Sequence, residues 1–208
     1  HTAYRRQRQM CIRDRARATD LPVSTKLRLC DNAQDTPELA VRLAGAGARL
    51  VTLHARHVAP NRRRARAAKL EYVRDTVEAL RTHGMHASCA GGRTVVLSNG
   101  NVRAFSDVAD NLQATGADGA MVGEPLLDVP DMFAPALGRP HADVRGVLAT
   151  YLGYCEQYPV DVSLGYVHQH VQSIVRGKMP PGRDARALSD ALRAAQSVAE
   201  MQRVLERP

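Results

Sequence analysis

The chain has 208 residues, of which 44% are hydrophobic and 24% are charged. This composition is typical of a globular protein with one large or two small domains, and it excludes collagen, coiled coils and disordered chains. No apolar run reaches the roughly 18 to 20 residues of a membrane span, so we expect no membrane partner. The four cysteines are far apart and form no Cys-x-x-Cys pair. This spacing indicates reduced thiols, no bound metal, and a cytoplasmic or nuclear location.

The formal net charge of +8 is concentrated in two segments, which predicts a polyanionic partner. Residues 1–20 carry six arginines against two aspartates, a balance of +4. Residues 55–74 carry seven basic residues against one glutamate, a balance of +6. We expect the cluster inside this second segment to contact RNA phosphates, and a solvated surface run is the alternative. The cluster consists of Arg62, Arg63, Arg64 and Arg66.

The chain begins with a segment, residues 1–20, that has no apolar periodicity. Its string RQMCIRDR resembles linker sequence, so we expect this segment to be disordered and to lie outside the fold. Short apolar runs then alternate with amphipathic stretches, which is the signature of a parallel α/β sheet or barrel. Strands are predicted at 22–29, 48–54, 94–98 and 118–122. Helices are predicted at 36–47, 68–84 and 106–116, with a surface loop at 86–92.

After residue 138 the strand pattern stops and only helical patterns follow. Helices are predicted at 142–158, 163–177, 183–195 and 197–206, the last opened by a Ser197/Glu200 capping box. The chain therefore divides into a segment 1–20 outside the fold, a half barrel 21–138 and a helical domain 139–208. A complete eight-stranded barrel takes about 250 residues, so this chain has room for half of one.

Polar residues end each apolar run of the predicted sheet. In parallel α/β folds, functional residues lie at the carboxyl ends of the strands. Each residue alone has an ordinary explanation, as a solvated lysine, a structural histidine or a turn. Together they predict a phosphate-bearing cofactor laid across the strand ends, with glycines admitting the phosphate and the lysine neutralising charge. The residues are Lys26, His54, Asn99, Gly100, Asn101, Gly123 and Glu124.

These segments resemble a known family. PVSTKLRL, GAGARLVTLHAR and LSNGNVRAFSDVADNLQATGADGAMVGEPLLDVPDMF are similar, in that order, to the second half of the flavin-dependent tRNA-dihydrouridine synthases, over roughly residues 19–205. Glu124 after the last strand resembles the eukaryotic 16/17 type, which acts on the D-loop. SLGYVHQHV resembles the family's C-terminal helix, whose Tyr-Val-x-x-His pattern ends here at His170.

The resemblance implies the second half of a TIM (β/α)8 barrel followed by a helical tRNA-binding domain. It implies a monomer that reduces uridine in the tRNA D-loop to 5,6-dihydrouridine, with NADPH as reductant and FMN as cofactor. The target base must be flipped out to reach the flavin. FMN would be held by Lys26, His54, Asn99, Gly100, Asn101, Gly123 and Glu124, and tRNA by the arginine cluster and His170.

The sequence also departs from the family. The family's catalytic cysteine lies in an Asn-x-Gly-Cys-Pro motif upstream of the strand equivalent to 22–29, and this sequence contains no such motif. We therefore expect no catalytic residue here, and a chain that is inactive alone, either as a fragment or as a degenerate copy. Two alternatives stay open: a non-catalytic RNA-binding module derived from such an enzyme, and an unrelated phosphate-binding barrel enzyme.

Overall fold

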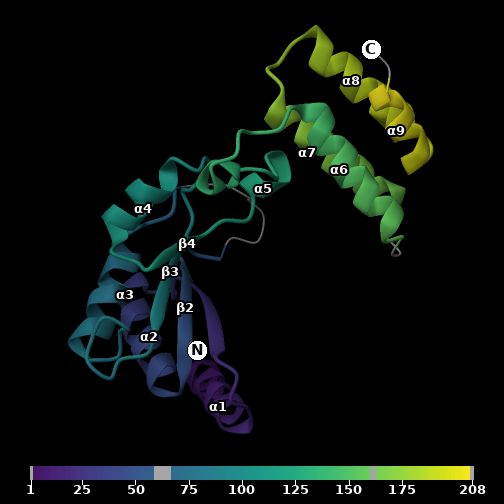
Figure 1. The fold of residues 1–208 in the computed structure, drawn as a ribbon. Helices are drawn as coiled ribbons and strands as arrows, with labels where there is room; N and C mark the ends of the chain where they lie inside the picture. The colour runs from purple at the N-terminus through teal and green to yellow at the C-terminus, as the bar shows by residue number, and fades with distance from the viewer. Residues whose placement is uncertain (1, 59–66, 160–162, 207–208) are drawn as a thin grey trace. The chain divides into compact units, whose positions relative to one another are not determined.

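The computed structural model describes residues 2–58, 67–159 and 163–206 (Figure 1). The chain forms two compact units, His1–Val122 and Gly123–Pro208. The boundary therefore lies earlier in the chain than the predicted one at residue 138. The reason is that the short helix α5 (Pro125–Asp128) packs against the long helix α7 (Leu164–Lys178) of the second unit.

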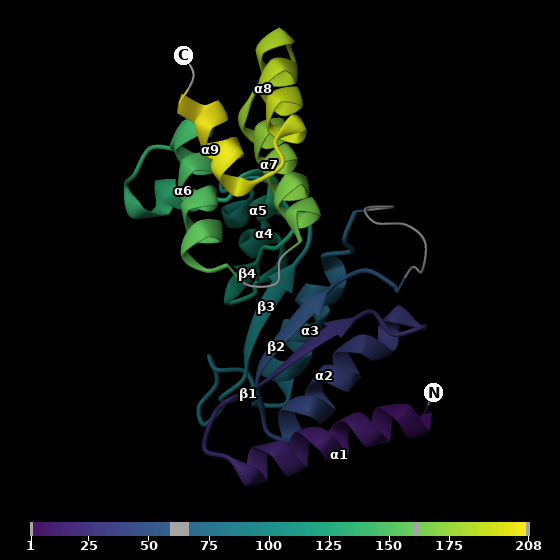
Figure 2. The same cartoon turned by 90° about the vertical axis from the view of Figure 1, so that its right-hand side faces the viewer.

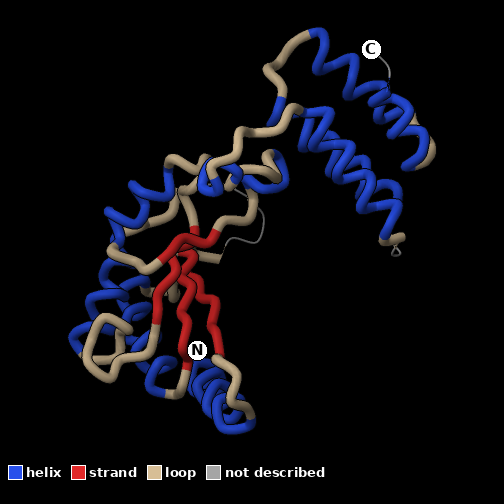
Figure 3. The backbone as a smooth tube through the Cα atoms, in the orientation of Figure 1, coloured by secondary structure: helices blue, strands red, loops and turns tan. Residues whose placement is uncertain are grey.

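The first unit is built on a parallel sheet with the strand order β1-β2-β3-β4 (Figure 3). Each strand is hydrogen-bonded to the next one along the chain, so the predicted set of adjacent parallel strands is confirmed. Strand, helix and strand alternate, as in half of a (β/α)8 barrel. The strands are β1 (Val23–Arg28), β2 (Ala48–His54), β3 (Val95–Asn99) and β4 (Gly119–Met121). The connections carry η1 (Ala33–Asp35), α2 (Thr36–Gly45), α3 (Glu71–Thr82) and α4 (Asp107–Thr115).

The sheet of the first unit has one face covered by its own helices. Helices α2 and α3 pack against each other on this face (Figures 1 and 2). Side chains alternate between the two faces of a strand, and on β1 Leu27 is buried whereas Lys26 and Arg28 are exposed. The core under the helices includes Val51, Leu53 and Val96, each 0% exposed. The opposite face is the one that carries Lys26.

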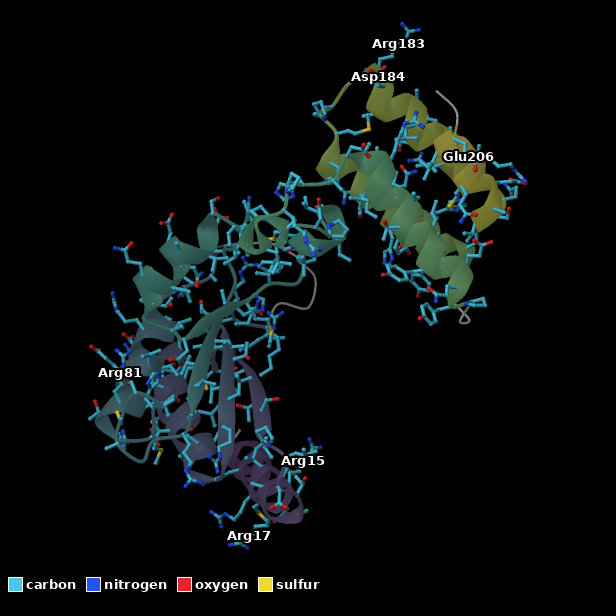
Figure 4. The ribbon with its side chains drawn as sticks, viewed as in Figure 1. Arg15, Arg17, Arg81, Arg183, Asp184 and Glu206 are labelled. Atoms are coloured by element: carbon cyan, nitrogen blue, oxygen red, sulfur yellow. The ribbon has the colours of Figure 1, made fainter. Side chains whose placement is uncertain are left out.

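Residues 2–18 form helix α1 (Thr2–Ala18), where the sequence predicted disorder. Ile12 packs against the core of the first unit. Gly47 leaves room for the helix, because a Cβ there would lie 2.7 Å from the Cβ of Ala16. Because helix α1 contacts the rest of the first unit through few side chains, its sequence has no periodic apolar stripe from which the helix could be predicted. Arg15 and Arg17 project outward from this helix (Figure 4).

The second unit consists of helices joined by loops, without a strand among its described residues. The predicted helices of the C-terminal domain are confirmed, and their core includes Leu148, Leu152, Ile174 and Met201, at most 2% exposed. Ser197 Oγ accepts from the Glu200 N–H at 3.2 Å, which is one half of the predicted capping box, whereas the Glu200 carboxylate accepts from the Gln196 N–H at 2.7 Å. Besides α5, α7 and η2 (Ala134–Leu137), the elements are α6 (Val144–Gln157), α8 (Arg183–Ala194) and α9 (Val198–Glu206). None of the helices in the described residues has the length and apolar character to cross a membrane.

Candidate cofactor site at the carboxyl end of the sheet

The carboxyl ends of β1, β2 and β3 bring Lys26, His54 and Asn99 together on one face of the sheet. His54 is the register partner of both Arg28 and Asn99. Register partners in a parallel sheet point to the same face, and Lys26 shares that face with Arg28 because the two are separated by one residue. The predicted clustering of these three side chains is thus seen within the first unit.

A hydrogen-bonded chain crosses the sheet at this end. The Lys26 Nζ donates to the Asn99 Oδ1 at 2.8 Å, although the two residues lie on β1 and β3. The Asn99 Nδ2 in turn donates to the backbone carbonyl of Met121, on β4, at 2.7 Å. The amide of Asn99 is therefore held in one orientation, and the ammonium of Lys26 is drawn toward the middle of the sheet.

Two cationic side chains lie side by side on this face. Partial burial of its ammonium, and then the positive charge of Arg28, lower the pKa of Lys26. The guanidinium of Arg28 also donates to the carbonyl of His57 at 3.3 Å. An anionic group bound here would counter the repulsion between the two cations, so the electrostatics favour an anionic ligand.

The turn after β3 has a backbone that the sequence Asn-Gly-Asn suits. Gly100 has φ +122°, and a Cβ on it would lie 2.7 Å from the Cβ of Ala68 and 3.6 Å from Cδ2 of His54. Asn101 follows with φ +61°, which asparagine tolerates better than most residues. The Asn111 Nδ2, on α4, donates to the Gly100 carbonyl at 3.0 Å. The turn is thereby fixed against both the neighbouring loop and the following helix.

Asn101 uses its side-chain amide to clasp the backbone of Ala68. Its Oδ1 accepts from the Ala68 N–H at 2.7 Å, and its Nδ2 donates to the Ala68 carbonyl at 2.8 Å. The N–H of Lys69 donates to the carbonyl of Ala55 at 2.8 Å. Together these bonds, which we call the loop clasp, close the base of the basic segment that follows β2. The side chain of Asn101 therefore holds the backbone at Ala68, where the basic segment returns to the sheet.

The other predicted site residues lie elsewhere. Gly123 and Glu124 follow β4 after one intervening residue and belong to the second unit. His170 is exposed on α7 in the second unit, where its Nδ1 lies 2.8 Å from the hydroxyl of Tyr151. The predicted arginine cluster lies outside the described residues: Arg62, Arg63, Arg64 and Arg66. Arg28 was missed, although the alternation in VSTKLR places it two residues after Lys26 on the same face.

Comparison with known proteins identifies the family. The sequence profile described as "Dihydrouridine synthase (Dus)" matches residues 5–205, a range that includes most of α1. A "Probable tRNA-dihydrouridine synthase" of Rickettsia typhi is 30% identical over 120 residues, 55% of this chain and 31% of the relative. A "tRNA-dihydrouridine(16/17) synthase [NAD(P)(+)]-like" protein of Rattus norvegicus is 30% identical over 151 residues, 73% of this chain and 30% of the relative.

A third relative is a "tRNA-dihydrouridine(20a/20b) synthase [NAD(P)+]-like" protein of Mus musculus, 25% identical over 123 residues, 59% of this chain and 33% of the relative. The chain thus spans about a third of the length of these curated relatives. The family profile, in contrast, covers nearly all of the chain. The four parallel strands with Lys26, His54 and Asn99 at one end and the helical second unit are therefore part of a protein of the dihydrouridine synthase family.

Proposed function

We propose that this chain supplies the FMN-binding strand ends and the tRNA-binding helices of a tRNA-dihydrouridine synthase of the 16/17 type. Such an enzyme uses NADPH to reduce uridine in the D-loop to 5,6-dihydrouridine. The observation that carries the proposal is the hydrogen bond between Lys26 and Asn99, made across the sheet at its carboxyl end. The names of the relatives supply the substrate class, a uridine of tRNA, and the nicotinamide reductant.

The groups at these strand ends suit a flavin mononucleotide. Lys26 and Arg28 offer positive charge to a phosphate or to the electron-rich edge of the flavin ring, and the amide of Asn99 is already oriented. His54 adds an imidazole at the end of β2, which can donate or accept a hydrogen bond. When bound here and reduced by NADPH, the flavin would supply the hydride for C6 of the uracil ring. The protein groups orient the flavin and hold its negative charge.

Titration of FMN, followed by quenching of its fluorescence, tests this site. Half of the strand ends of a complete barrel are absent from this sheet, so we expect weak binding that saturates only at high FMN concentration. Lys26→Ala and Asn99→Ala should each weaken binding by about 10-fold or more, because a hydrogen bond to a charged group contributes roughly 1.5 to 3 kcal/mol. Arg49→Ala removes an exposed charge from the amino end of β2 and should leave binding unchanged. Tight binding that neither variant affects would place the site elsewhere.

We further propose that the chain alone does not turn over tRNA. The sequence has no Asn-x-Gly-Cys-Pro motif, so the proton donor for C5 of uracil is missing. General acid catalysis contributes roughly 10²- to 10⁴-fold, so only trace reduction is expected. The test incubates the purified chain with FMN, NADPH and unmodified tRNA and measures dihydrouridine by mass spectrometry of nucleosides. Turnover at the rate of a complete synthase would contradict the proposal.

A non-catalytic RNA-binding module is the second candidate function. It is favoured by the separate hydrophobic core of the second unit, which includes Leu152 and Val171 at 0% exposure. A helical unit with its own core can present an RNA-binding surface without a cofactor. The FMN titration separates the two candidates, because a pure RNA-binding module would bind tRNA and show no specific quenching of FMN.

A further inference from the structure

Four of the chain's six tyrosines lie on or directly after helices α6 and α7 of the second unit. Three of them are largely exposed: Tyr154 at 59%, Tyr158 at 61% and Tyr166 at 59%. Within α6 to α9 these three are the only exposed large hydrophobic side chains among the described residues. Solvent-exposed tyrosines on a helix pair do not serve its core, so this placement points to a ligand.

Helical spacing aligns these side chains into one surface. Tyr151, Tyr154 and Tyr158 follow a spacing of three and then four residues, and Tyr166 and His170 are four residues apart, so each set lies along one side of its helix. The two sets meet where the Tyr151 hydroxyl lies 2.8 Å from Nδ1 of His170. We call these five side chains the tyrosine surface.

Ring–ring contacts order the tyrosine surface. The rings of Tyr154 and Tyr158 are stacked, with centroids 6.5 Å apart and planes inclined by 26°. The rings of Tyr151 and His170 meet edge to face, with centroids 5.6 Å apart. Burial and a hydrogen bond with Cys155 raise the pKa of Tyr151. A surface ordered in this way loses less side-chain entropy when a flat ligand stacks on it.

The charge around the tyrosine surface is compatible with a polyanion. Glu156 is the only carboxylate among the described residues of α6 and α7, and its Oε2 accepts from the Gln202 Nε2, on α9, at 3.1 Å. The tyrosine surface consists of four phenol rings and one imidazole. Tyrosine and histidine rings are typical of surfaces that stack unpaired nucleobases.

We propose that the tyrosine surface stacks the unpaired bases of an RNA strand, with Tyr154 and Tyr158 as its centre. This is a contact to bases, distinct from the phosphate contacts expected of the arginine cluster. The identification of the RNA as tRNA rests on the proposed function. Stacking on a base contributes about 5- to 150-fold in affinity for each base, which is the range expected from about 1 to 3 kcal/mol.

The test measures binding of a fluorescein-labelled oligouridine to the full chain by fluorescence anisotropy. Replacing both tyrosines, as Tyr154→Ala with Tyr158→Ala, should weaken binding at least about 5-fold. Tyr154→Phe with Tyr158→Phe keeps the rings and should bind like the unaltered chain. Gln169→Ala removes an exposed side chain of α7 that borders Tyr166 but carries no ring, and serves as the control for stacking. The unfolding temperature of each variant shows whether the fold is retained.

Salt dependence distinguishes stacking from phosphate contact. The alanine pair should lower the affinity at every salt concentration and leave the slope of log K against log salt unchanged, because each lost phosphate contact would flatten that slope by about 0.7. Unchanged affinity in the alanine pair would overturn the proposal, as would an equal loss in the phenylalanine pair. If the alanine pair instead abolishes self-association seen by sedimentation and binds RNA normally, the surface is a protein contact and the proposal is wrong.

FMN titration of the same variants keeps this proposal separate from the proposed function. The tyrosine variants should bind FMN like the unaltered chain, because Lys26 and Asn99 lie in the first unit. Loss of FMN binding in Lys26→Ala together with normal RNA binding by that variant would support both proposals independently.

Discussion

At the scale of single residues, Asn101 holds two parts of the first unit together. Its left-handed backbone, with φ +61°, directs the side-chain amide at both polar groups of the Ala68 backbone. The same turn contains Gly100, whose missing Cβ admits the side chain of Ala68 and whose Cα lies beside the ring of His54. One turn of the chain thus lies against the histidine and anchors the end of the basic segment.

Two substitutions at Asn101 separate the contribution of its side-chain hydrogen bonds from that of its left-handed backbone. Asn101→Gly keeps the left-handed backbone and loses the two hydrogen bonds, so it should lower the free energy of unfolding by about 1 to 2 kcal/mol. Asn101→Ala loses the same two bonds and keeps a Cβ in the left-handed region, which alanine tolerates less well than asparagine, at a further cost of about 1 kcal/mol. Urea unfolding at neutral pH measures both. Equal stability of the glycine variant and the unaltered chain would show that the clasp contributes nothing.

The sequence could identify the ends of the strands but not the partners of each side chain. Lys26, His54 and Asn99 were predictable, because each polar residue follows an apolar run and parallel strands share their carboxyl ends. The pairing of Asn101 with Ala68 was not, since it joins positions 33 residues apart in the chain. His86 was predicted in a surface loop, yet it is 1% exposed and its Nε2 lies 3.0 Å from Asp118. A polar loop composition conceals such a buried pair.

At the scale of elements, a pair of contacts joins the end of α7 to the segment before α6. The Lys178 Nζ donates to both carboxylate oxygens of Asp131 at 2.8 Å, and its side chain is only 7% exposed. The Asp131 carboxylate also accepts from the Ala142 N–H at 2.9 Å. Next to this pair, Gly177 has no Cβ where the backbone carbonyl of Asp128 on α5 approaches. Packing of α5 on α7 therefore depends on the small size of Gly177, and the segment that follows α5 is held to α7 by the charge of Lys178.

Removing the ammonium of Lys178 should destabilise the second unit. Lys178→Met keeps most of the side-chain stem and leaves the carboxylate of Asp131 without its main partner. It should therefore lower the free energy of unfolding by about 1 to 3 kcal/mol. Calorimetry of the variant beside Arg183→Met, an exposed residue at the start of α8, measures this loss. A loss no larger than that of the control would contradict the importance of the ion pair.

The ion pair of Lys178 and Asp131 also predicts that the free energy of unfolding depends on pH. Burial opposes ionisation of Asp131, but hydrogen bonds from Lys178, Ala142 and His141 outweigh it, so the pKa of Asp131 is lowered in the folded chain. The stabilisation is therefore fully present above the unfolded pKa, roughly 4, and is lost as the pH falls through the lower folded value. Urea midpoints should fall more steeply below pH 4 in the unaltered chain than in Lys178→Met. Parallel curves would show that the pair does not contribute.

Elements were predicted where periodicity is strong and missed where it is weak. The four C-terminal helices have apolar stripes that bury Leu148, Val171, Leu192 and Met201, and their ranges agree closely with the prediction. Helix α1 escaped because its packing on the first unit involves few side chains, among them Ile12. A helix stabilised by so few tertiary contacts leaves no repeated apolar pattern to detect.

At the scale of the whole molecule, each unit has a hydrophobic core of its own. Leu53 belongs to the core of the first unit and Leu152 to that of the second, and both are 0% exposed. The predicted boundary at residue 138 was set by the end of the strand pattern. The observed one follows the packing of α5 on α7, a contact between positions far apart in sequence that local pattern does not encode.

Separate cores predict two unfolding transitions. Leu53→Ala should lower the temperature of one transition and Leu152→Ala that of the other, each reducing stability by about 2 to 5 kcal/mol. Differential scanning calorimetry of both variants measures this. A single transition that both variants shift equally would mean that the two units unfold as one.

The loop clasp also fixes where the chain leaves the sheet and where it returns. The residues between Ala55 and Ala68 are anchored at the far end by Asn101, which lies outside the segment, and at both ends by backbone groups. Near its start the segment is also tied to β1, because the Leu29 N–H donates to the Arg56 carbonyl at 3.2 Å and the guanidinium of Arg28 donates to the His57 carbonyl at 3.3 Å. An engineer who grafts a foreign peptide between these tied ends would therefore know both points at which it joins the cofactor end of the sheet.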